Sequence, residues 1–380
     1  MRIVIAMDSF KGSLSAPAAC EAVCRGFRAE IPGATFSLIP MADGGEGTVE
    51  CIAAACGVEV RRETVPDLFG RGKECAYALL DGGKTTVIET AMAAGIADLK
   101  PNERDVLRAS TYGVGMQMRN ALLRGSEKII LGLGGSATTD CALGALQALG
   151  VVFYDADGNR IADGAGGGDL SRIVRADASA MVSSSGVEIV YACDVTNPLY
   201  GSNGAAFVYA PQKGADRSTV EALDEGLRSF SAVLARCFGR DVSQVPGAGA
   251  AGGLCGGLLC GLGGSVRSGF DILSDAALLE EKISAADLVI TGEGKTDGQT
   301  VFGKLPCRLG EKAKKYAVPA VVISGSVLPS ASDLYDRGIT ALFDTVPAPA
   351  SLESVMENAE KNLEFTARNL ARMISAISSK

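Results

Sequence analysis

The stretch at residues 128–150 is KIILGLGGSATTDCALGALQALG, and its order of apolar, glycine and leucine residues indicates an α/β fold. The apolar run Ile129–Leu131 is followed by three glycines and then by leucines at helical spacing. This order predicts a buried strand, a glycine turn and a helix. Glycine lets the backbone approach a ligand closely, and the first N–H groups of a helix have no partner within it. The segment therefore predicts an anion-binding turn, with a phosphate-bearing ligand as the first inference.

The same turn also fits a dinucleotide-binding fingerprint. Gly132, Gly134 and Ala137 match the spacing of that motif, and Asp155 follows the next apolar run, where a ribose-binding acid belongs. A tight strand–helix turn without any ligand would use the same residues. The turn alone leaves these interpretations open.

Composition narrows the classes of protein to consider. The chain has 380 residues, of which 47% are hydrophobic and 21% charged, and 48 are glycine. These values predict a soluble α/β protein with two domains. The formal net charge of −8, without a block of Lys or Arg, argues against nucleic acid as a partner. An acidic protein that binds a polyphosphate needs Mg²⁺ and a few well-placed lysines.

Two residue types restrict the chemistry further. Histidine is absent, which excludes His-based triads and His zinc sites and leaves acid–base chemistry to Asp, Glu, Lys, Tyr or Cys. The eleven cysteines are scattered through apolar segments without a C-x-x-C motif, so reduced, buried thiols and a cytoplasmic location are predicted.

Residues 242–266 carry no charge and are long enough to span a bilayer. They contain Pro246 and a ladder of glycines at four-residue spacing (249, 253, 257 and 261). We therefore predict a helix whose small face packs closely on a neighbour, and no membrane partner.

The pattern of predicted elements changes twice along the chain. Residues 2–31 and 35–57 read as two strand–loop–helix units, and strands of the parallel type return after residue 286. The intervening part contains alternating strands with a hairpin turn at Asp81–Gly83, and a long helix at about 218–237. We predict that residues 1–66 and 286–380 form one Rossmann-like, doubly wound α/β domain. Residues 67–285 are predicted to form a second α/β domain, with a mixed sheet, that is inserted into the first. A last amphipathic helix is expected at about 352–375.

Five polar loops each follow the carboxyl end of a predicted strand. They are MDSFKGS (7–13), MADGGEGT (41–48), GLGGSATTD (132–140), ACDVTNP (192–198) and TGEGKTDG (291–298). Ligands bind at that edge of α/β sheets, so one cleft between the two domains is predicted. Carboxylates without histidine suit Mg²⁺, which takes oxygen ligands and bridges phosphates.

Each loop also has a plain structural interpretation. Asp8, Ser9 and Lys11 suit an anionic substrate but also the capped start of a helix. The acidic loop from Asp43 to Glu46 suits a metal ion or a substrate diol but also the first turn of a helix.

The later loops allow similar pairs of interpretations. Asp194 suits a general base or an Asx turn, and Lys213 suits a phosphate contact or a solvated loop. Glu293, Lys295 and Asp297 lie in one glycine loop, where three charges are best explained by a ligand.

Several segments, in this order, closely resemble the bacterial glycerate kinase family. They are DSFKGSLSA (8–16), MADGGEGT (41–48), STYGVG (110–115), GLGGSAT (132–138), CDVTNPL (193–199), APQKGA (210–215), PGAGAAGGL (246–254) and ITGEGKTDGQTVFGK (290–304). The resemblance covers nearly the whole chain. It implies an enzyme that phosphorylates D-glycerate with ATP and Mg²⁺, built from a Rossmann-like domain of both chain ends and an inserted α/β domain.

This hypothesis assigns a role to each candidate residue. The nucleotide phosphates and Mg²⁺ are assigned to Gly134, Gly135, Ser136, Thr138, Asp140, Lys213, Glu293 and Asp297, with Asp140 and Asp297 as metal ligands. Glycerate is assigned to Asp8, Ser9, Lys11, Asp43, Gly44 and Gly45. Asp194, Lys11 and Asp297 are the predicted catalytic residues, with Asp194 accepting the hydroxyl proton.

The chain departs from the family at two places. Thr139-Asp140-Cys141-Ala142 stands where the family usually has Asn-Asp-Gly-Gly, which keeps the carboxylate but removes the Asn amide. Lys295-Thr296-Asp297 stands where the family has Arg-Ile-Asp, which keeps the charge but not the two-pronged guanidinium.

Two other functions remain as alternatives. A nicotinamide-dependent oxidoreductase of a small hydroxy acid follows from the Gly132–Ala137 fingerprint and Asp155. A non-catalytic sugar-acid sensor would use the same cleft without releasing ADP. For the kinase, the resemblance favours 2-phosphoglycerate as the product, and the chain is expected to be a monomer or a homodimer.

Overall fold

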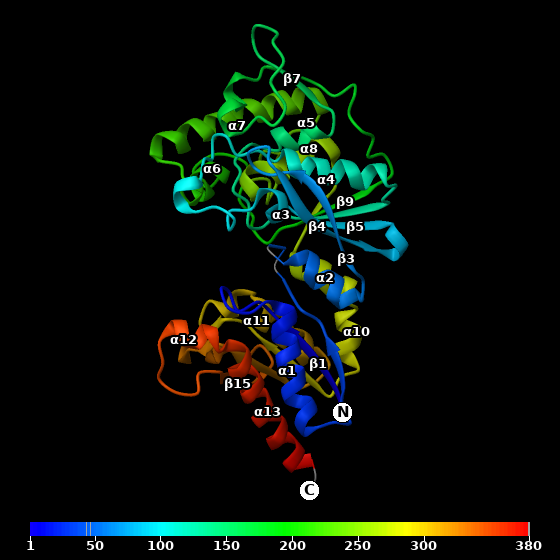
Figure 1. Cartoon of the computed structure of the whole chain (residues 1–380), viewed down its shortest axis with the longest axis vertical. Helices are drawn as coiled ribbons and strands as arrows, with labels where there is room; N and C mark the ends of the chain where they lie inside the picture. Colours follow the sequence, from blue (N-terminus) through cyan, green and yellow to red (C-terminus); the bar gives the residue numbers. More distant parts are fainter. Residues whose placement is uncertain (43, 46, 379–380) are drawn as a thin grey trace. The chain divides into compact units, whose positions relative to one another are not determined.

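The structure is a computed structural model that describes residues 1–42, 44, 45 and 47–378. The chain forms two compact units (Figure 1). Unit 1 comprises residues 1–42, 50–57 and 270–380, and unit 2 comprises residues 43–49 and 58–269. The predicted architecture is confirmed: both chain ends build one α/β unit, and a second α/β unit with a mixed sheet is inserted between them.

Unit 1 is built around a five-stranded parallel sheet. Its strands are β1 (Arg2–Met7), β2 (Thr35–Leu38), β11 (Leu288–Gly292), β13 (Ala320–Ser324) and β15 (Ile339–Asp344), with a small ladder of β12 (Lys295–Thr296) and β14 (Ser326–Val327). Its helices are α1 (Ala16–Glu30), α9 (Gly269–Ala276), α10 (Leu279–Ser284), α11 (Leu305–Lys315), α12 (Leu352–Glu357) and α13 (Ala359–Ser378), and most of α2 (Thr48–Cys56) also belongs here. The last two replace the single C-terminal helix that the sequence predicted.

The order of the strands places a ligand site in unit 1. The sheet runs β2-β1-β11-β13-β15, so the connection leaves β1 in one direction and returns to its other side at β11. In doubly wound sheets, ligands bind outside the carboxyl ends of the strands at such a reversal. In this unit the reversal lies between Met7 and Gly292, which pair with each other in register.

The core of unit 1 packs on both faces of the sheet. Ile3, Ile5 and Met7 alternate along β1 and contact α1 and α13, which run side by side (Figure 1). A Cβ on Gly26 of α1 would lie 2.6 Å from the carbonyl oxygen of Glu364, so glycine permits this close approach. Helix α1 begins as predicted, because the Ser15 hydroxyl accepts a hydrogen bond from the N–H of Ala18.

Unit 2 contains a six-stranded mixed sheet in the order β10-β9-β6-β5-β4-β3. Its strands are β3 (Val60–Pro66), β4 (Gly72–Leu80), β5 (Thr85–Glu89), β6 (Lys128–Gly132), β9 (Glu188–Ala192) and β10 (Ser265–Arg267), with a separate hairpin of β7 (Val152–Tyr154) and β8 (Arg175–Asp177). Its α-helices are α3 (Thr90–Ala94), α4 (Tyr112–Leu123), α5 (Leu143–Ala148), α6 (Ala205–Tyr209), α7 (Arg217–Phe238) and α8 (Leu254–Leu262). Strands β5, β6, β9 and β10 are parallel, and the predicted hairpin at Asp81–Gly83 joins the antiparallel pair β4 and β5.

Three elements fall on the other side of the boundaries expected from the sequence. Strand β3 precedes residue 67, but all seven of its residues pair with β4, so it belongs to the sheet of unit 2. Helices α9 and α10 precede residue 286 but pack in unit 1, where Arg308 of α11 binds Asp271 of α9. Strand pairing and helix docking, which a change in sequence pattern does not reveal, set these boundaries.

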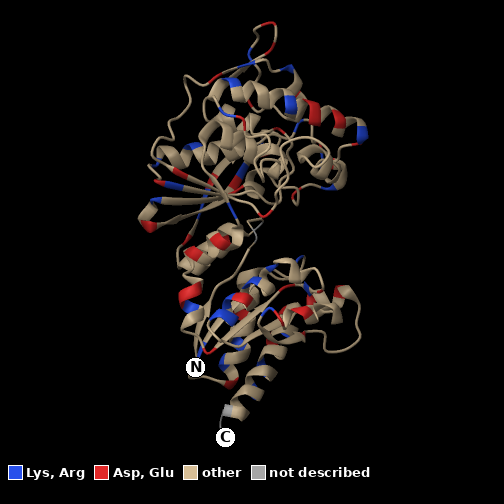
Figure 2. Cartoon of the chain, turned by 180° about the vertical axis from the view of Figure 1, so that it is seen from behind, with Lys and Arg blue, Asp and Glu red and all other residues tan. Residues whose placement is uncertain are grey.

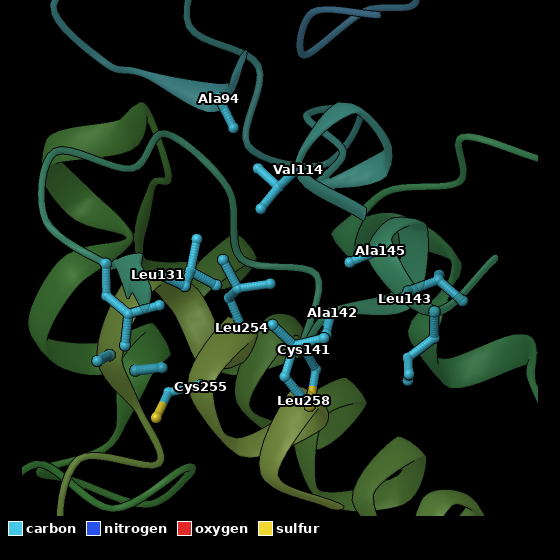
Figure 3. Packing of buried hydrophobic residues seen from close by; sticks show 14 of the residues in the cluster. Ala94, Val114, Leu131, Cys141, Ala142, Leu143, Ala145, Leu254, Cys255 and Leu258 are labelled. Atoms are coloured by element: carbon cyan, nitrogen blue, oxygen red, sulfur yellow. The ribbon is translucent and has the colours of Figure 1, made fainter. Parts of the chain in front are cut away.

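The glycine ladder forms a short, closely packed helix, α8, preceded by a 3₁₀ turn at Ala250–Gly253. A Cβ on Gly257 would collide with the carbonyl oxygen of Cys141, which confirms the predicted small packing face. Figure 3 shows Leu254 and Leu258 of α8 beside Cys141 and Ala142 in the core of unit 2. Fully burying each leucine stabilises such a core by roughly 1.5–3 kcal/mol.

The charged residues and the cysteines are distributed as the composition of the chain leads us to expect. Figure 2 shows Lys and Arg interspersed with Asp and Glu over both units. All eleven cysteines carry free thiols, eight of them buried, as predicted. Burial raises the pKa of Cys20 to about 12 and that of Cys75 to about 11, so these thiols are poor nucleophiles at neutral pH.

Among the described residues, no helix has both the length and the apolar character needed to cross a membrane.

Candidate active site

The candidate site of unit 2 lies at the carboxyl edge of its parallel strands. Glu89, Gly132 and Ala192 end β5, β6 and β9, and they are neighbours in register: Glu89 pairs with Gly132, and Gly132 pairs with Ala192. The loops after β6 and β9 are the GLGGSATTD and ACDVTNP loops that the sequence singled out. The parallel register therefore brings the glycine turn and the Asp194 loop to one edge.

A third loop, which contains Gly44 and Gly45, lies against the same edge. The N–H of Gly134 donates to the carbonyl oxygen of Gly44 (3.1 Å). A Cβ on Gly134 would collide with the Cα of Gly45, and a Cβ on Gly44 would lie 3.0 Å from the carbonyl oxygen of Ala192. Glycine is thus required where the two loops touch. The predicted residue Asp43 lies outside the described residues.

Glu89 is a site residue that the sequence reasoning missed. Its side chain is fully buried, and its two carboxylate oxygens accept hydrogen bonds from the N–H groups of Gly47 (2.6 Å) and Val49 (3.0 Å). A buried carboxylate with two backbone donors fixes a loop firmly. Glu89 thereby holds Gly47 and Val49 near the glycine turn.

The glycine turn itself offers backbone donors. Gly135 is exposed and has a φ of +74°, a conformation that glycine adopts without strain. Within the described part of the chain, the N–H groups of Gly135 and Ser136 have no hydrogen-bond acceptor. Adjacent backbone N–H groups of this kind form anion-binding concavities.

The helix that follows does not contribute to this turn, which corrects the predicted strand–turn–helix arrangement. Helix α5 begins only at Leu143, and its first N–H groups are already paired: Gly144 donates to Asp140 (3.3 Å) and Ala145 to the Thr111 hydroxyl (3.0 Å). These acceptors leave no free helix N-terminus for a ligand. An anion at the turn would therefore meet loop N–H groups only.

The surroundings of Asp140 favour a structural role over the predicted metal ligation. Its carboxylate is fully buried, and Oδ2 accepts from the N–H (2.8 Å) and the hydroxyl (2.7 Å) of Thr111, besides the N–H of Gly144. Burial raises the pKa of Asp140, and the hydrogen bonds from Thr111 oppose that rise. Asp140 connects the turn to the start of α4 and α5.

Lys213 is also inside the protein rather than at its surface. It is 2% exposed, and its Nζ donates to the carbonyl oxygen of Thr138 (2.6 Å) and to the hydroxyl of Ser136 (3.1 Å). Burial lowers its pKa from 10.5 to about 7, while the charge of Asp140 acts in the opposite direction. Thr138 is fully buried as well, so Lys213 and Thr138 support the turn from behind.

The depressed pKa of Lys213 predicts a pH-dependent stability. Between about pH 7 and pH 10.5 the unfolded chain binds a proton at Lys213 that the folded protein has lost. The free energy of unfolding therefore increases with pH in this range, by up to about 1.4 kcal/mol per pH unit. Below pH 7 both states are protonated, and the full cost of burying the ammonium group remains.

The variant Lys213→Met isolates this contribution, because it keeps the length of the side chain and removes the charge. Urea unfolding of both proteins across the lower half of that pH range should show the wild type gaining stability relative to the variant. Cysteines titrate in the same range but are common to both proteins. If the free energies of unfolding of the two proteins change with pH in parallel, the depressed pKa of Lys213 is contradicted.

The nicotinamide interpretation does not fit this structure. Asp155 is half-buried and directly follows β7, at the start of the long connection to β8, where its carboxylate accepts from the N–H groups of Asp157 and Asn159. This hairpin is not part of the six-stranded sheet, so Asp155 does not end the next parallel strand, as the dinucleotide fold requires. The absence of a helix directly after Gly132–Ala137 removes the second element of that motif.

The candidate site of unit 1 lies at the reversal between β1 and β11. Asp8 follows β1, and its N–H donates to the carbonyl oxygen of Gly292 at the end of β11 (2.9 Å). The Asp8 carboxylate accepts from the N–H of Ser9 (2.6 Å), and Ser9 and Lys11 are exposed. A Cβ on Gly294 would lie 3.5 Å from the backbone nitrogen of Lys11, so the two predicted loops of this unit are in contact.

Glu293 is the buried acid of this site. It is 8% exposed, and Oε1 accepts from the hydroxyls of Thr300 (2.7 Å) and Thr296 (3.2 Å). Burial raises its pKa, and the bond from Thr300 and the charge of Lys304 oppose the rise. Lys304 Nζ lies 3.8 Å from Oε2. The residues that the sequence reasoning missed here are Thr296, Thr300 and Lys304.

Asp297 is more accessible than Glu293. Its Oδ2 lies 3.0 Å from Nζ of Lys295, and its Oδ1 accepts from the N–H of Gln299 (2.9 Å). The hydrogen bond from Lys295 is the main reason that the pKa of Asp297 is below its usual value. Lys295 itself is exposed, so this pair can separate when a ligand arrives.

Asp194 is the exposed carboxylate of unit 2 at the carboxyl edge. It follows β9 directly, two residues after Ala192, which contacts Gly44. The structure therefore brings Gly44, Gly45, Gly134, Gly135, Ser136 and Asp194 together in unit 2, and Asp8, Ser9, Lys11, Glu293 and Asp297 together in unit 1. The predicted single cleft for both groups stays a prediction.

Comparisons with known proteins agree with this arrangement. The sequence profile described as "Glycerate kinase family" matches residues 3–375. The chain is 44% identical to a glycerate kinase of Halalkalibacterium halodurans over 97% of each protein, and 40% identical to a glycerate 2-kinase of Escherichia coli K12 over 99% of this chain and 98% of that one. A crystal structure of a protein assigned as glycerate kinase 2 of Salmonella typhimurium LT2 superposes over the full length of both chains, with a TM-score of 0.88 and 40% identity. The chain therefore belongs to the glycerate kinase family and is a phosphotransferase.

Proposed function

We propose that the protein transfers the terminal phosphoryl group of ATP to D-glycerate in a Mg²⁺-dependent reaction, with 2-phosphoglycerate as the product. The observation that supports this most directly is the pair of loop clusters at the carboxyl edges of the two sheets. One offers unpaired backbone N–H groups, and the other offers acids and a lysine. The Escherichia coli relative is a glycerate 2-kinase, which supports phosphorylation at the 2-position.

The nucleotide phosphates are proposed to bind the glycine turn. Gly134 permits the close approach of the neighbouring loop, and Gly135 and Ser136 supply the free N–H donors. Lys213 and Thr138 would act from behind the turn, because both are buried and Lys213 already donates to Ser136. Near neutral pH the side-chain amine of Lys213 is protonated in only part of the molecules. The backbone N–H groups therefore carry most of the interaction with phosphate.

Glycerate is proposed to bind the loop after β1. Its carboxylate needs a positive partner, and Lys11 is an exposed lysine next to the strand reversal in unit 1. Its hydroxyls need acceptors and donors of the kind that Asp8 and Ser9 provide. Gly44, Gly45 and Asp43 are the proposed contributions of the MADGGEGT loop.

The acids of the late loop fit a Mg²⁺ ion that arrives with the nucleotide. No cluster of three or more acidic or thiol ligands occurs among the described residues. Mg²⁺ bound to a nucleotide takes one or two carboxylates, phosphate oxygens and water, and neutralises phosphate charge. Asp297 offers an accessible carboxylate, and Glu293 supports its loop. Asp140 is too enclosed for this role.

The proposed transfer forms a bond between a glycerate hydroxyl oxygen and the γ-phosphorus, and it breaks the bond between that phosphorus and the bridging oxygen of ADP. The hydroxyl proton passes to Asp194, the exposed carboxylate at the end of β9. Phosphoryl transfer depends mainly on positioning and charge neutralisation, which loops fixed by Glu89 and by the Asp140 network provide.

A coupled assay of ADP release tests the proposal. The purified protein is mixed with ATP, Mg²⁺ and either D-glycerate or a related hydroxy acid, and the phosphorylated product is identified by NMR. We expect D-glycerate to be preferred, the phosphate on the 2-hydroxyl, and turnover to stop when EDTA removes Mg²⁺. Binding of glycerate without ADP release would contradict a kinase and favour the sensor. The free cysteines support the cytoplasm as the site of action.

A further inference from the structure

Unit 2 contains a cavity outside the residues assigned so far. Its volume is about 610 Å³, which falls within the range of about 300–1,000 Å³ typical of small-molecule sites. Its walls are the turn between β3 and β4, the segment 102–108, which begins within the 3₁₀ turn Pro101–Glu103, and the approach to α7 at Gly214. All of these belong to unit 2, and neither the family nor the proposed function assigns them a role.

Three arginines line this cavity. Arg71 is paired with Asp67, but the guanidinium of Arg108 has no ion pair within the described chain. Arg104 donates from Nη1 to the carbonyl oxygen of Gln212 (2.9 Å), while its Nε is buried without an acceptor. Glu103 and Asp105 also line the cavity, so its wall carries charges of both signs, and the guanidinium groups favour an electron-rich ligand.

The walls of the cavity also contain planar groups, namely an aromatic ring and guanidinium groups. The guanidinium carbons of Arg71 and Arg108 lie 5.7 Å and 5.9 Å from the centre of the Phe69 ring. Aromatic rings and guanidinium planes are the groups on which nucleobases stack. The Asn102 side chain adds an amide that can both donate to and accept from a base edge or a ribose. This combination suits a planar base better than a small inorganic anion, which would fill only a fraction of the volume.

Two chain segments connect the cavity to the glycine turn. Lys213 donates to the Ser136 hydroxyl of the turn, and the next residue, Gly214, lines the cavity. Gly95 forms a bridge with Ser136, and the chain then runs to Asn102 in the cavity wall. Residues that contact the glycine turn are therefore followed in the chain by residues of the cavity wall.

We propose that this cavity binds the base and ribose of the nucleotide whose phosphates bind the glycine turn. The inference rests on the proposed kinase function and adds a location for the nucleoside. Phe69 and Arg108 form the stacking surface, and Arg104 belongs to the same wall. The nucleoside and the phosphates would then both be bound by residues of unit 2.

A single tryptophan can test this, because the chain contains none. Phe69→Trp places the only indole in the proposed stacking surface. Saturating ADP is expected to quench its fluorescence, with a midpoint equal to the Kd measured by calorimetry. Inorganic phosphate and D-glycerate are expected to leave it unchanged. In the otherwise native chain, Arg108→Ala is expected to weaken ADP binding about tenfold.

Matched controls come from another ring–guanidinium pair of the unit, Tyr154 and Arg175, which lies outside the cavity. Tyr154→Trp should not respond to ADP, and Arg175→Ala should bind ADP normally. If the native protein binds ADP but Phe69→Trp shows no change and Arg108→Ala keeps full affinity, the cavity assignment is overturned and the kinase function stands. If the native protein neither binds nor releases ADP, the kinase proposal itself fails.

Discussion

Replacing Asp140 by alanine is expected to lower the free energy of unfolding by more than about 3 kcal/mol. The substitution leaves three buried donors without an acceptor: the N–H and hydroxyl of Thr111 and the N–H of Gly144. Each unpaired buried group costs roughly 1–3 kcal/mol. Asp140→Asn keeps one acceptor oxygen for these donors and should recover about half of the loss. Urea unfolding of both variants measures the effect.

Asp157→Ala provides the matched control, because Asp157 is an exposed loop carboxylate of the same unit and should change stability by less than about 0.5 kcal/mol. A second consequence concerns Lys213, since the charge of Asp140 raises its pKa. The alanine variant should therefore hold Lys213 neutral at lower pH than the native protein does. If Asp140→Ala stays as stable as the native protein and loses only its response to Mg²⁺, the structural role is wrong and the predicted metal ligand is restored.

The fold could be predicted because its signals are local. Apolar runs such as Ile3–Met7 and Ile129–Leu131 are buried on both faces of a parallel sheet, and they appear in the sequence without interruption. The position of the polar loops at the carboxyl ends followed from the same pattern. The exact start of α5 did not, because it depends on an acceptor network between Asp140 and Thr111, 29 residues apart in the chain.

The departure from the family pattern at this point has a structural meaning. Cys141 and Ala142, which stand where the family usually has two glycines, adopt φ angles of +50° and +62°. Residues with a Cβ adopt this left-handed region at a cost of roughly 1–2 kcal/mol each. Both residues therefore adopt a backbone conformation that glycine would adopt without this cost. The Asp140 network and the tight packing of Gly257 against Cys141 hold it in place.

The candidate site was predictable only in part. Residues within glycine loops, such as Gly134 and Glu293, stand out in the sequence because charge and flexibility coincide there. Glu89 did not, since it ends an ordinary strand and its partners are backbone N–H groups forty residues away. The sequence also did not show that the side chains of Lys213 and Asp140 are buried. A loop lysine and a loop carboxylate look the same in a sequence whether they face solvent or the interior.

Replacing Asp194 by alanine is expected to reduce kcat by about 10²–10⁴-fold, the range for loss of a general base, with a smaller change in KM. Asp194 is exposed at the end of β9, beside the loops that carry the proposed phosphate donors. The variant should therefore unfold like the native protein while ADP release slows. Asp194→Asn, which keeps the shape but cannot take a proton, should be impaired to a similar degree.

The control for Asp194 is Asp163→Ala, which removes an exposed carboxylate of the same unit that is paired with Arg160. It should leave kcat unchanged. The dependence of kcat on pH separates a base from a residue that only positions substrate: loss of the base removes the acidic limb of the profile, whereas loss of a positioning contact lowers the whole curve. Near-normal turnover of Asp194→Ala at neutral pH would exclude Asp194 as the proton acceptor. Asp8 of unit 1 would then be the next candidate, because it is the acid at the strand reversal where glycerate is proposed to bind.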